Sequence, residues 1–312
     1  MAPTEWLLPE WLGSPWALGL LGLVVGSFLN VVIHRLPRML ERQWWAEAGG
    51  LVGDGDSHRR VFGRELPPTL AAEAKRLDEE LQSLAPLGLA KPASRCPSCG
   101  HRLRWIENIP VLSWVFLRAR CAACRQPIPL RYPMVELLTA VLFAAVGWRF
   151  GGTMASLLWC AAAATLVAAA LIDWDTTFLP DSLTLPLMWA GLVAAAAGWL
   201  PGLTLATSFI GAVAGYLTLW TVYWVFKRAT GKEGMGYGDF KLLAALGAWL
   251  GWQALLPIVL LASGIGAVVG LAMKAMGGLR EGGYVPFGPF LAGGGLAVML
   301  IGLPRVLALM GW

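Results

Sequence analysis

The sequence predicts an all-α polytopic membrane protein with about eight transmembrane helices and one small hydrophilic domain between the first and second of them. Three observations lead to this fold class. Of the 312 residues, 57% are hydrophobic and only 14% are charged, whereas about a quarter of an ordinary soluble domain is charged. Apolar runs of roughly 20 residues, long enough to cross a bilayer, recur along the chain. Most of the charge is confined to residues 34–133, which hold 16 of the 24 Lys and Arg and 10 of the 19 Asp and Glu.

The first predicted span covers about residues 15–33. It lacks the basic segment that begins a signal peptide, and Asn30, His34 and Arg35 stand where the small residues of a cleavage site would be expected. We therefore expect this span to be retained. Seven further apolar runs predict the rest of the bundle, at about 134–150, 153–172, 182–200, 204–226, 240–252, 254–276 and 287–309.

Basic residues near the span ends predict the orientation, because positively charged loops stay in the cytoplasm. The hydrophilic insert is flanked by Arg35, Arg38, Arg42, Arg125 and Arg131. We therefore expect the insert on the cytoplasmic side, together with the connections at 173–181, 227–241 and 274–280, and both termini outside. The net charge of +5 suits contact with an anionic lipid bilayer. No basic stripe with interleaved aromatic residues is present, so no nucleic-acid partner is expected.

Four cysteines of the insert form two closely spaced pairs. Cys96 and Cys99 are followed, after 21 intervening residues, by Cys121 and Cys124. Two such pairs bring four thiolates together in the tetrahedral arrangement that a structural zinc ion requires. Disulfides are disfavoured in the cytoplasm, although redox-active pairs remain an alternative. A closed four-sulfur site leaves no open position for catalysis, so zinc would serve to fold the small domain.

The other features of the insert and its neighbours have simpler interpretations. His101 is not expected to be a metal ligand, and Cys160, inside the third span, is expected to be a small core residue. Apolar positions recur at helical spacing between Leu70 and Leu84, which predicts a solvated amphipathic helix. The glycine-rich stretch from Gly49 to Asp56 predicts a loop.

Carboxylates at the membrane edge are the strongest candidates for function, because charge within or at the ends of spans is costly. The candidates are Glu136, Asp173, Asp175, Asp181 and Asp239. Asp173 ends the third span and Asp239 opens the sixth, so the predicted topology places both at the same depth on the same side. Asp181 is expected to cap a helix N-terminus. Asp173 lies at a helix C-terminus, where the helix dipole opposes an anion, so its position favours a functional role.

Two carboxylates that share a site cannot both ionise readily, so one holds a proton. The ionised partner can act as a general base on water while the protonated one hydrogen-bonds the carbonyl under attack. This is the chemistry of aspartyl proteases. Gly236 and Gly238 lack a Cβ atom and would let a substrate backbone approach Asp239 closely. Two acids at a membrane face also suit an ion or proton pathway, so their spacing alone leaves both functions open.

A family resemblance favours the protease. Gly236-Tyr237-Gly238-Asp239 resembles the signature of the GxGD intramembrane aspartyl proteases, and the wider pattern is most similar to the bifunctional type IV prepilin peptidases of bacteria. The other segments that carry the resemblance are residues 27–37, the stretches 96–101 and 107–110, Cys121 to Cys124 with Arg131-Tyr132-Pro133, and Ile172-Asp173 with Leu179-Pro180-Asp181. Residues 39–91 are longer than the matching segment of shorter members, and their role is left open.

The resemblance implies a function and a set of residues. Asp173 and Asp239 would be the catalytic pair of an enzyme that cleaves the leader peptide of type IV prepilins and type II secretion pseudopilins after a glycine. The cut would lie at the cytoplasmic face of the bacterial inner membrane. The enzyme would then methylate the new N-terminal residue with S-adenosylmethionine. The implied division of the chain is a first span at 1–33, a zinc-binding domain at 34–133 and a seven-span peptidase bundle at 134–312.

The methyl-donor site has no independent sequence signal. The chain lacks the glycine-rich strand-to-helix turn of dinucleotide-binding folds, so methylation rests on the resemblance alone. Gly100, Glu107 and Asn108, next to the cysteines, are weak candidates for a part in it.

Two rival functions make different predictions. A transporter or channel would lose flux on mutation of either aspartate and would cut no peptide, although the two halves of the chain show no matching pair of interrupted spans. A zinc-domain protein that only binds pilin precursors would leave the precursor mass unchanged.

Overall fold

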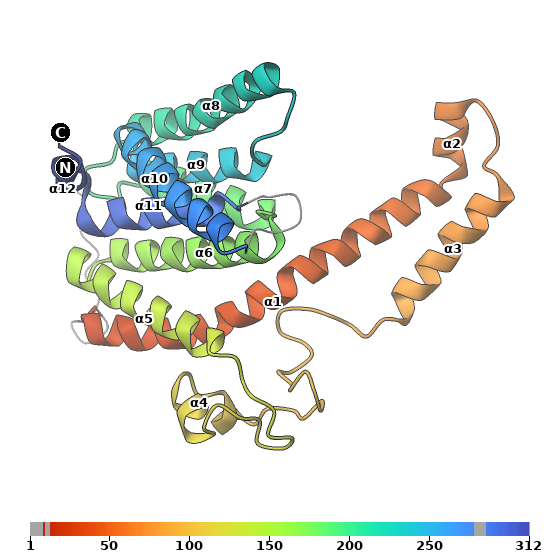
Figure 1. Ribbon diagram of the computed structural model, residues 1–312, viewed down its shortest axis with the longest axis horizontal. Coiled ribbons are helices and arrows are strands. Elements are labelled where there is room, and N and C mark those ends of the chain that lie inside the picture. The colour runs from red at the N-terminus through yellow and green to blue at the C-terminus, as the bar shows by residue number, and fades with distance from the viewer. Residues whose placement is uncertain (1–8, 10–12, 278–284, 312) are drawn as a thin grey trace.

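The computed structural model describes residue 9 and residues 13–277 and 285–311. The described chain is almost entirely helical, and its only β-structure is two isolated bridges. A helical bundle forms the main body, and a long arm and a small irregular domain leave it near one end (Figure 1). The predicted all-helical fold, with the four cysteines between the first and second spans, is confirmed.

Helix α1 (Pro15–Gly53) is much longer than the predicted first span. It begins at Ser14, whose side chain accepts a hydrogen bond from the backbone N–H of Ala17, and it continues as one helix through Pro37. The expected loop at Gly49 to Asp56 is therefore wrong, because α1 ends only at Gly53 and α2 (Gly55–Phe62) begins two residues later. The physical reason lies in packing: a Cβ atom at Gly49 would lie 3.1 Å from Leu77.

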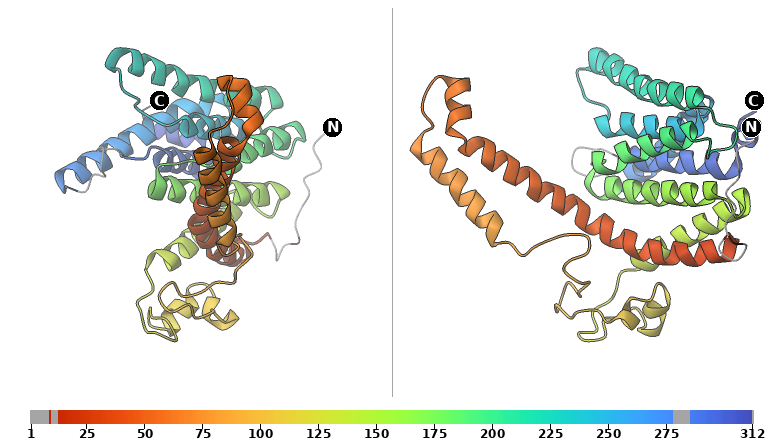
Figure 2. Two further views of the ribbon diagram at one scale, coloured as in Figure 1. Left: turned by 90° about the vertical axis from the view of Figure 1, so that its right-hand side faces the viewer. Right: turned by 180° about the vertical axis from the view of Figure 1, so that it is seen from behind.

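The arm consists of the second half of α1, the short α2 and helix α3 (Pro68–Ser83), which folds back along α1 (Figures 1 and 2). The amphipathic helix predicted at 70–84 is confirmed, and its buried Ala74 faces α1 beside Gly53. Trp44, on the arm, makes an edge contact with Phe178 at a centroid distance of 5.0 Å. The arm therefore contacts the loop that follows Asp173.

The bundle is built from the remaining helices. In chain order they are α5 (Arg131–Phe150), α6 (Met154–Thr176), α7 (Asp181–Ala196), α8 (Leu205–Thr230), α9 (Tyr237–Leu250), the 3₁₀ turn η2 (Trp252–Ala254), α10 (Leu255–Ala275), α11 (Gly288–Ile301) and α12 (Leu303–Leu309). All eight predicted spans are thus helical over most of their length. Helices α6 and α9 carry the largest share of the core, and every residue from Leu242 to Trp249 is buried.

Small residues allow the closest helix contacts. Gly22 and Gly26 of α1, four residues apart, lie against α5, where a Cβ atom on either would come 2.7 Å from a backbone Cα atom. Gly211 and Gly215 of α8 meet the backbone of α9 in the same manner. Such pairs are typical of helices that pack in lipid, where close van der Waals contact replaces the hydrophobic effect.

Five described helices are long and apolar enough to cross a membrane: α1, α5, α6, α8 and α10 with its preceding turn. The predicted span at 287–309 is not one straight helix, because α11 and α12 meet at an angle of 110° around Gly302. Counted as one broken span, this pair raises the number to six. Helices α7 and α9, at 16 and 14 residues, are shorter than the length of about 20 that a span needs.

The small domain, residues 94–130, lies between α3 and α5. It contains the 3₁₀ turn η1 (Trp105–Asn108), the short helix α4 (Leu112–Phe116) and the two β-bridges, Arg95 with Arg102 and Arg120 with Pro127. Each bridge closes a loop that holds one cysteine pair. We refer to this segment as the four-cysteine domain.

Candidate active site and metal centre

Asp173 lies in the last turn of α6 and is 5% exposed. Its Oδ2 atom accepts a hydrogen bond of 3.0 Å from the backbone N–H of Gly288, the first residue of α11. A segment 115 residues away in sequence therefore helps to orient this carboxylate.

Asp239 lies in the first turn of α9 and is 6% exposed. The C-terminal end of α6 and the N-terminal end of α9 lie at the same end of the bundle (Figure 1). The two carboxylates are close enough to repel each other electrostatically. The two acids thus lie at the same end of the bundle, which is compatible with the predicted placement.

The glycines around the two acids share one neighbour, Leu179. A Cβ atom at Gly238 would lie 2.6 Å from the Cβ atom of Leu179, and one at Gly288 would lie 2.6 Å from Asp173 Oδ2 and 3.0 Å from Leu179 Cδ1. At Gly236 nothing is nearer than 4.0 Å. Gly238 and Gly288 are therefore glycines because the loop after Asp173 packs directly on them, whereas Gly236 faces open space.

The two neighbouring acids, Asp175 near the end of α6 and Asp181 at the start of α7, form ion pairs. Asp175 meets the guanidinium of Arg131 through both oxygens, at 2.8 and 2.6 Å. Asp181 lies at a helix N-terminus as expected, but Pro180 and not Asp181 is the N-cap of α7, and the Asp181 carboxylate meets Lys241 Nζ at 2.6 Å instead of capping the helix. Both pairs tie neighbouring helices together around the two buried aspartates. Asp175 lies only two residues from Asp173 but differs from it, because Asp175 forms an exposed ion pair with Arg131 whereas Asp173 is buried.

The four predicted metal ligands come together. The Sγ atoms of Cys96, Cys99, Cys121 and Cys124 all lie within 4.8 Å of one another. Two of the separations are 3.8 and 4.0 Å, close to the roughly 3.8 Å between sulfurs in a regular tetrahedron with metal–sulfur bonds of about 2.3 Å. A disulfide would need about 2.05 Å, so the donor set and its spacing fit a four-thiolate metal site.

The two loops that hold the cysteines have the same backbone design. In the first, the N–H of Gly100 donates to Cys96 O and the N–H of Cys96 donates to His101 O. In the second, Arg125 and Gln126 take the places of Gly100 and His101 around Cys121. Backbone N–H groups of Cys99 and Ser98 lower the pKa of the Cys96 thiol to about 6, whereas desolvation and the neighbouring thiols raise the pKa of the Cys124 thiol to about 12. Four thiols at this spacing cannot all ionise readily unless a cation lies among them.

Glu107 organises the polar side of the four-cysteine domain. Its carboxylate is 7% exposed and accepts hydrogen bonds from the backbone and side chain of Arg104, and it lies 3.0 Å from His101 Nε2. These contacts, the backbone N–H first, lower the pKa of Glu107 to about 2. His101 is engaged here and is not among the four grouped ligands, as expected. Cys160 is buried in α6, also as expected.

A cavity of about 320 Å³ separates the four-cysteine domain from α1 and α5. Glu107, Asn108, Trp114, Tyr132 and Glu136 are among its lining residues, and Gly100 is not. Glu136 is 8% exposed and accepts a hydrogen bond of 2.7 Å from the backbone N–H of Val111.

The backbone is strained beside this cavity. Val111 has φ +58°, an unusual value for a β-branched residue. Strain of this kind is often retained where it serves a binding or catalytic site.

Gly288 is the residue of the site that the sequence interpretation missed. It follows Pro286 and Phe287 and precedes Pro289 at the start of the last apolar run. A glycine between prolines at a membrane edge is the same kind of signal as the glycines before Asp239, and it could have marked a second backbone segment at the site.

Two family models together match most of the chain. Residues 20–150 match the family model "Bacterial Peptidase A24 N-terminal domain", and residues 160–271 match "Type IV leader peptidase family". The first match contains all four cysteines and the second contains both buried aspartates. No solved structure matches the chain significantly.

Curated relatives cover nearly the whole chain. A protein of Aeromonas hydrophila named prepilin leader peptidase/N-methyltransferase is 47% identical over 302 residues, which is 93% of each chain. A protein of the same name from Pseudomonas putida is 48% identical over 90% of this chain and 88% of its own. One from Stutzerimonas stutzeri is 45% identical over 97% of this chain and 96% of its own.

Proposed function

Because the chain belongs to the family of prepilin leader peptidases/N-methyltransferases, we propose that Asp173 and Asp239 are the two carboxylates with which it cleaves prepilin leaders. The observation that carries this proposal is their convergence: two acids from α6 and α9, each at most 6% exposed, lie at one end of the bundle and interact electrostatically. A buried pair of like charges is costly unless one member holds a proton, and that state suits general acid–base catalysis of peptide hydrolysis.

The proposed reaction needs only a water molecule and the pair. The ionised carboxylate accepts a proton from water, and the resulting hydroxide adds to the scissile carbonyl, whose oxygen is hydrogen-bonded by the protonated carboxylic acid. As the C–N bond breaks, the proton is delivered to the leaving amine. The N–H of Gly288 fixes the orientation of Asp173, and Arg131 and Lys241 neutralise the two neighbouring acids. The pair is thus kept apart from competing carboxylates.

The substrates we propose are type IV prepilins and type II secretion pseudopilins, cut after a glycine at the cytoplasmic face of the bacterial inner membrane. Positive residues flank the end of the bundle that holds the two acids, as the positive-inside rule requires of a cytoplasmic face. A substrate whose hydrophobic helix stays in the lipid could present its charged leader at this end. The open space at Gly236 would admit the extended backbone.

We propose that S-adenosylmethionine is the methyl donor and that it binds in the cavity between the four-cysteine domain and helices α1 and α5. The cavity volume of about 320 Å³ lies within the range of small-molecule sites. Glu136 offers a carboxylate acceptor for hydroxyl and amino groups, and Trp114 and Tyr132 offer aromatic surface for a base. S-adenosylmethionine would supply an electrophilic methyl group when bound. Tyr132, which lines the cavity, follows Arg131 in sequence, and Arg131 pairs with Asp175 of α6. This ion pair therefore connects the wall of the cavity to the end of α6 that carries Asp173.

The metal we propose for the four thiolates is structural zinc. Four sulfur ligands complete a tetrahedral shell and leave no position for water, so the ion would hold the fold and would not enter the chemistry.

The test of the peptidase is mass spectrometry of a type IV prepilin incubated with the protein and S-adenosylmethionine. The wild type should remove a leader-sized mass and add one methyl group. Asp239→Asn should remove nothing while it retains the wild-type thermal unfolding profile, and Asp181→Asn, at the exposed ion pair, should still cleave. A folded Asp239→Asn protein with full activity would refute the aspartate pair.

The methyl-donor site is tested separately by equilibrium dialysis with radiolabelled S-adenosylmethionine. Glu136→Gln preserves side-chain volume and should weaken binding about 10-fold or more, the usual effect of losing a hydrogen bond to a charged group. Glu233→Gln, at an exposed ion pair with Lys227, is the matched control and should bind like the wild type. Unchanged binding in Glu136→Gln would exclude this cavity and leave the peptidase proposal intact.

A further inference from the structure

The four-cysteine domain carries a cluster of exposed apolar side chains that its own fold does not explain. The cluster consists of Trp105 (80% exposed), Ile106 (52%), Leu112 (53%), Val115 (57%) and Phe116 (81%). All five come from η1 and α4, within 12 positions of the sequence. Contiguous exposed apolar residues on a small domain mark a contact surface, because water is a poor solvent for them. We call these five residues the apolar patch.

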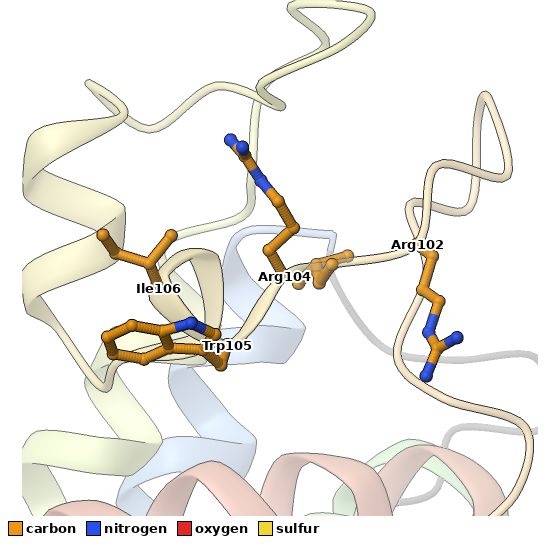
Figure 3. A pocket seen from close by; sticks show the side chains of 5 residues that line it. Arg102, Arg104, Trp105 and Ile106 are labelled. Atoms are coloured by element: carbon orange, nitrogen blue, oxygen red, sulfur yellow. The ribbon is translucent and has the colours of Figure 1, made fainter.

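Cationic side chains adjoin the apolar patch. Figure 3 shows Trp105 and Ile106 together, Arg104 beside them and Arg102 farther away, with the two arginine side chains directed to opposite sides. A groove with a volume of about 440 Å³ is lined by Arg102, Leu103, Arg104, Trp105 and Ile106. Aromatic and aliphatic groups next to guanidinium groups match the layered chemistry of a bilayer surface, which has acyl chains below and phosphates above.

The charge of the domain is strongly one-sided. Residues 94–130 contain six arginines and a single acid, Glu107, which Arg104 and His101 already engage. Five of these arginines are exposed and make no side-chain hydrogen bond or ion pair with any part of the chain that the structure describes: Arg95, Arg102, Arg118, Arg120 and Arg125. Even a divalent ion held by four thiolates, with a net charge of −2, leaves the domain positive. The surface is therefore complementary to an anionic partner.

The position of the patch favours lipid as that partner. The bundle helices α6 and α11 run horizontally in Figure 1, and α4 lies level with the N-terminal part of α5 along that direction rather than beyond the end of the bundle. The right-hand view of Figure 2 shows the same arrangement from behind. The outward face of α5 begins with Leu130 and Met134, each 58% exposed, and continues to Val141. Helix α4, which carries three of the five patch residues, thus lies level with a helix whose exposed apolar side chains suit contact with hydrocarbon.

We propose that the four-cysteine domain docks on the anionic lipid surface of the adjacent leaflet, with the apolar patch at the boundary between headgroups and acyl chains and the exposed, unpaired arginines of the domain among the phosphates. Tryptophan and phenylalanine side chains are suited to this depth. Docking would hold the domain at the membrane surface. The cavity between the domain and helices α1 and α5 would then lie at the same level. This inference does not depend on the proposed function, because it concerns only where the domain lies.

The test uses the full-length protein in vesicles of phosphatidylethanolamine and phosphatidylglycerol. A photoreactive benzoylphenylalanine in place of Phe116 is irradiated, and the peptides are analysed by mass spectrometry for covalent lipid adducts. The matched control places the same group at Leu51, which is 68% exposed but lies on the arm. Lipid adducts at position 116, at least several-fold more abundant than at position 51, are expected.

Two further experiments keep the result decisive. Arg118→Gln combined with Arg120→Gln, or vesicles of phosphatidylcholine alone, should lower the adduct yield at position 116 several-fold if the arginines contact anionic headgroups. If the position 116 variant loses its metal, the same label at Trp105 replaces it. Absence of lipid adducts at both positions, or cross-links to a second copy of the chain or to an added prepilin instead of lipid, would overturn the proposal.

Discussion

Asp173 and Asp239 lie in α6 and α9, where most side chains are buried, whereas the four cysteines lie in a segment with almost no core. From Leu242 to Trp249 every residue is buried. In residues 94–130 only Glu107 and Cys121 are buried. Helix packing therefore sets the geometry of the two carboxylates, whereas the proposed metal ion would set that of the thiolates. The first site should tolerate loss of its chemistry without loss of fold, and the second should not.

Removal of a thiolate should produce the largest effect. Cys96→Ser should bind far less than one zinc ion per chain. Zinc binding contributes roughly 10–16 kcal/mol to the folding of small zinc domains, and this domain has few buried side chains to replace that contribution. Metal analysis and limited proteolysis within residues 94–130 would measure the change. Cys160→Ala, in the buried core of α6, is the control and should keep its zinc. A Cys96→Ser protein with stoichiometric zinc and a protected domain would contradict a metal-held fold.

Replacement of either buried aspartate should have the opposite effect: cleavage should be lost and the fold retained. Asp173→Asn and Asp239→Asn keep the side-chain volume but remove a proton donor and acceptor, so cleavage should fall by about 10²–10⁴-fold or more. Thermal unfolding should stay close to that of the wild type, and methylation of an already cleaved pilin should continue. Initial rates of leader removal give the measurement. If both variants lost fold and activity together, the carboxylates would be structural groups.

The same contrast explains what the sequence could predict. Cysteine spacing specifies the metal site because four ligands and a tetrahedron leave few alternatives, and apolar runs specify the helices because lipid demands them. The aspartates could be named because acids at span ends are rare. The contact of Gly288 with Asp173 spans 115 residues and depends on how α11 packs, which no local pattern encodes.

The length of α1 could not be predicted for a related reason. Polar residues after position 33 indicated the end of a membrane span, and that is not the end of a helix. The helix continues to Gly53 because α3 packs against it, with Gly49 and Gly53 providing the close approach to Leu77 and Ala74. Glycines that allow helix contact and glycines that form loops look the same in a single sequence.

A smaller effect is expected where the backbone supports the active site. Gly288→Ala would place a Cβ atom 2.6 Å from Asp173 Oδ2, so the carboxylate must move and cleavage should fall about 10-fold, at a cost of about 1–3 kcal/mol in stability. Gly293→Ala, on the same helix, meets nothing within 4 Å and should leave cleavage unchanged. Kinetics and thermal unfolding of the two variants would separate them. Equal activities would show that the Gly288 contact does not orient Asp173.

The smallest expected effect distinguishes the two cysteine loops. Gly100 and Arg125 occupy equivalent positions with φ of +71° and +61°, a conformation that costs a non-glycine residue roughly 1 kcal/mol. Arg125→Gly should therefore slow zinc loss to a chelator about two- to five-fold, which corresponds to about 0.5–1 kcal/mol. Gly100→Ala, which meets no steric contact, should accelerate it by a similar factor. Slower zinc loss in both variants, or faster loss in both, would mean that side-chain contacts and not backbone conformation decide how tightly each loop holds its half of the site. Opposite signs would establish that the second loop carries the strain that glycine removes from the first.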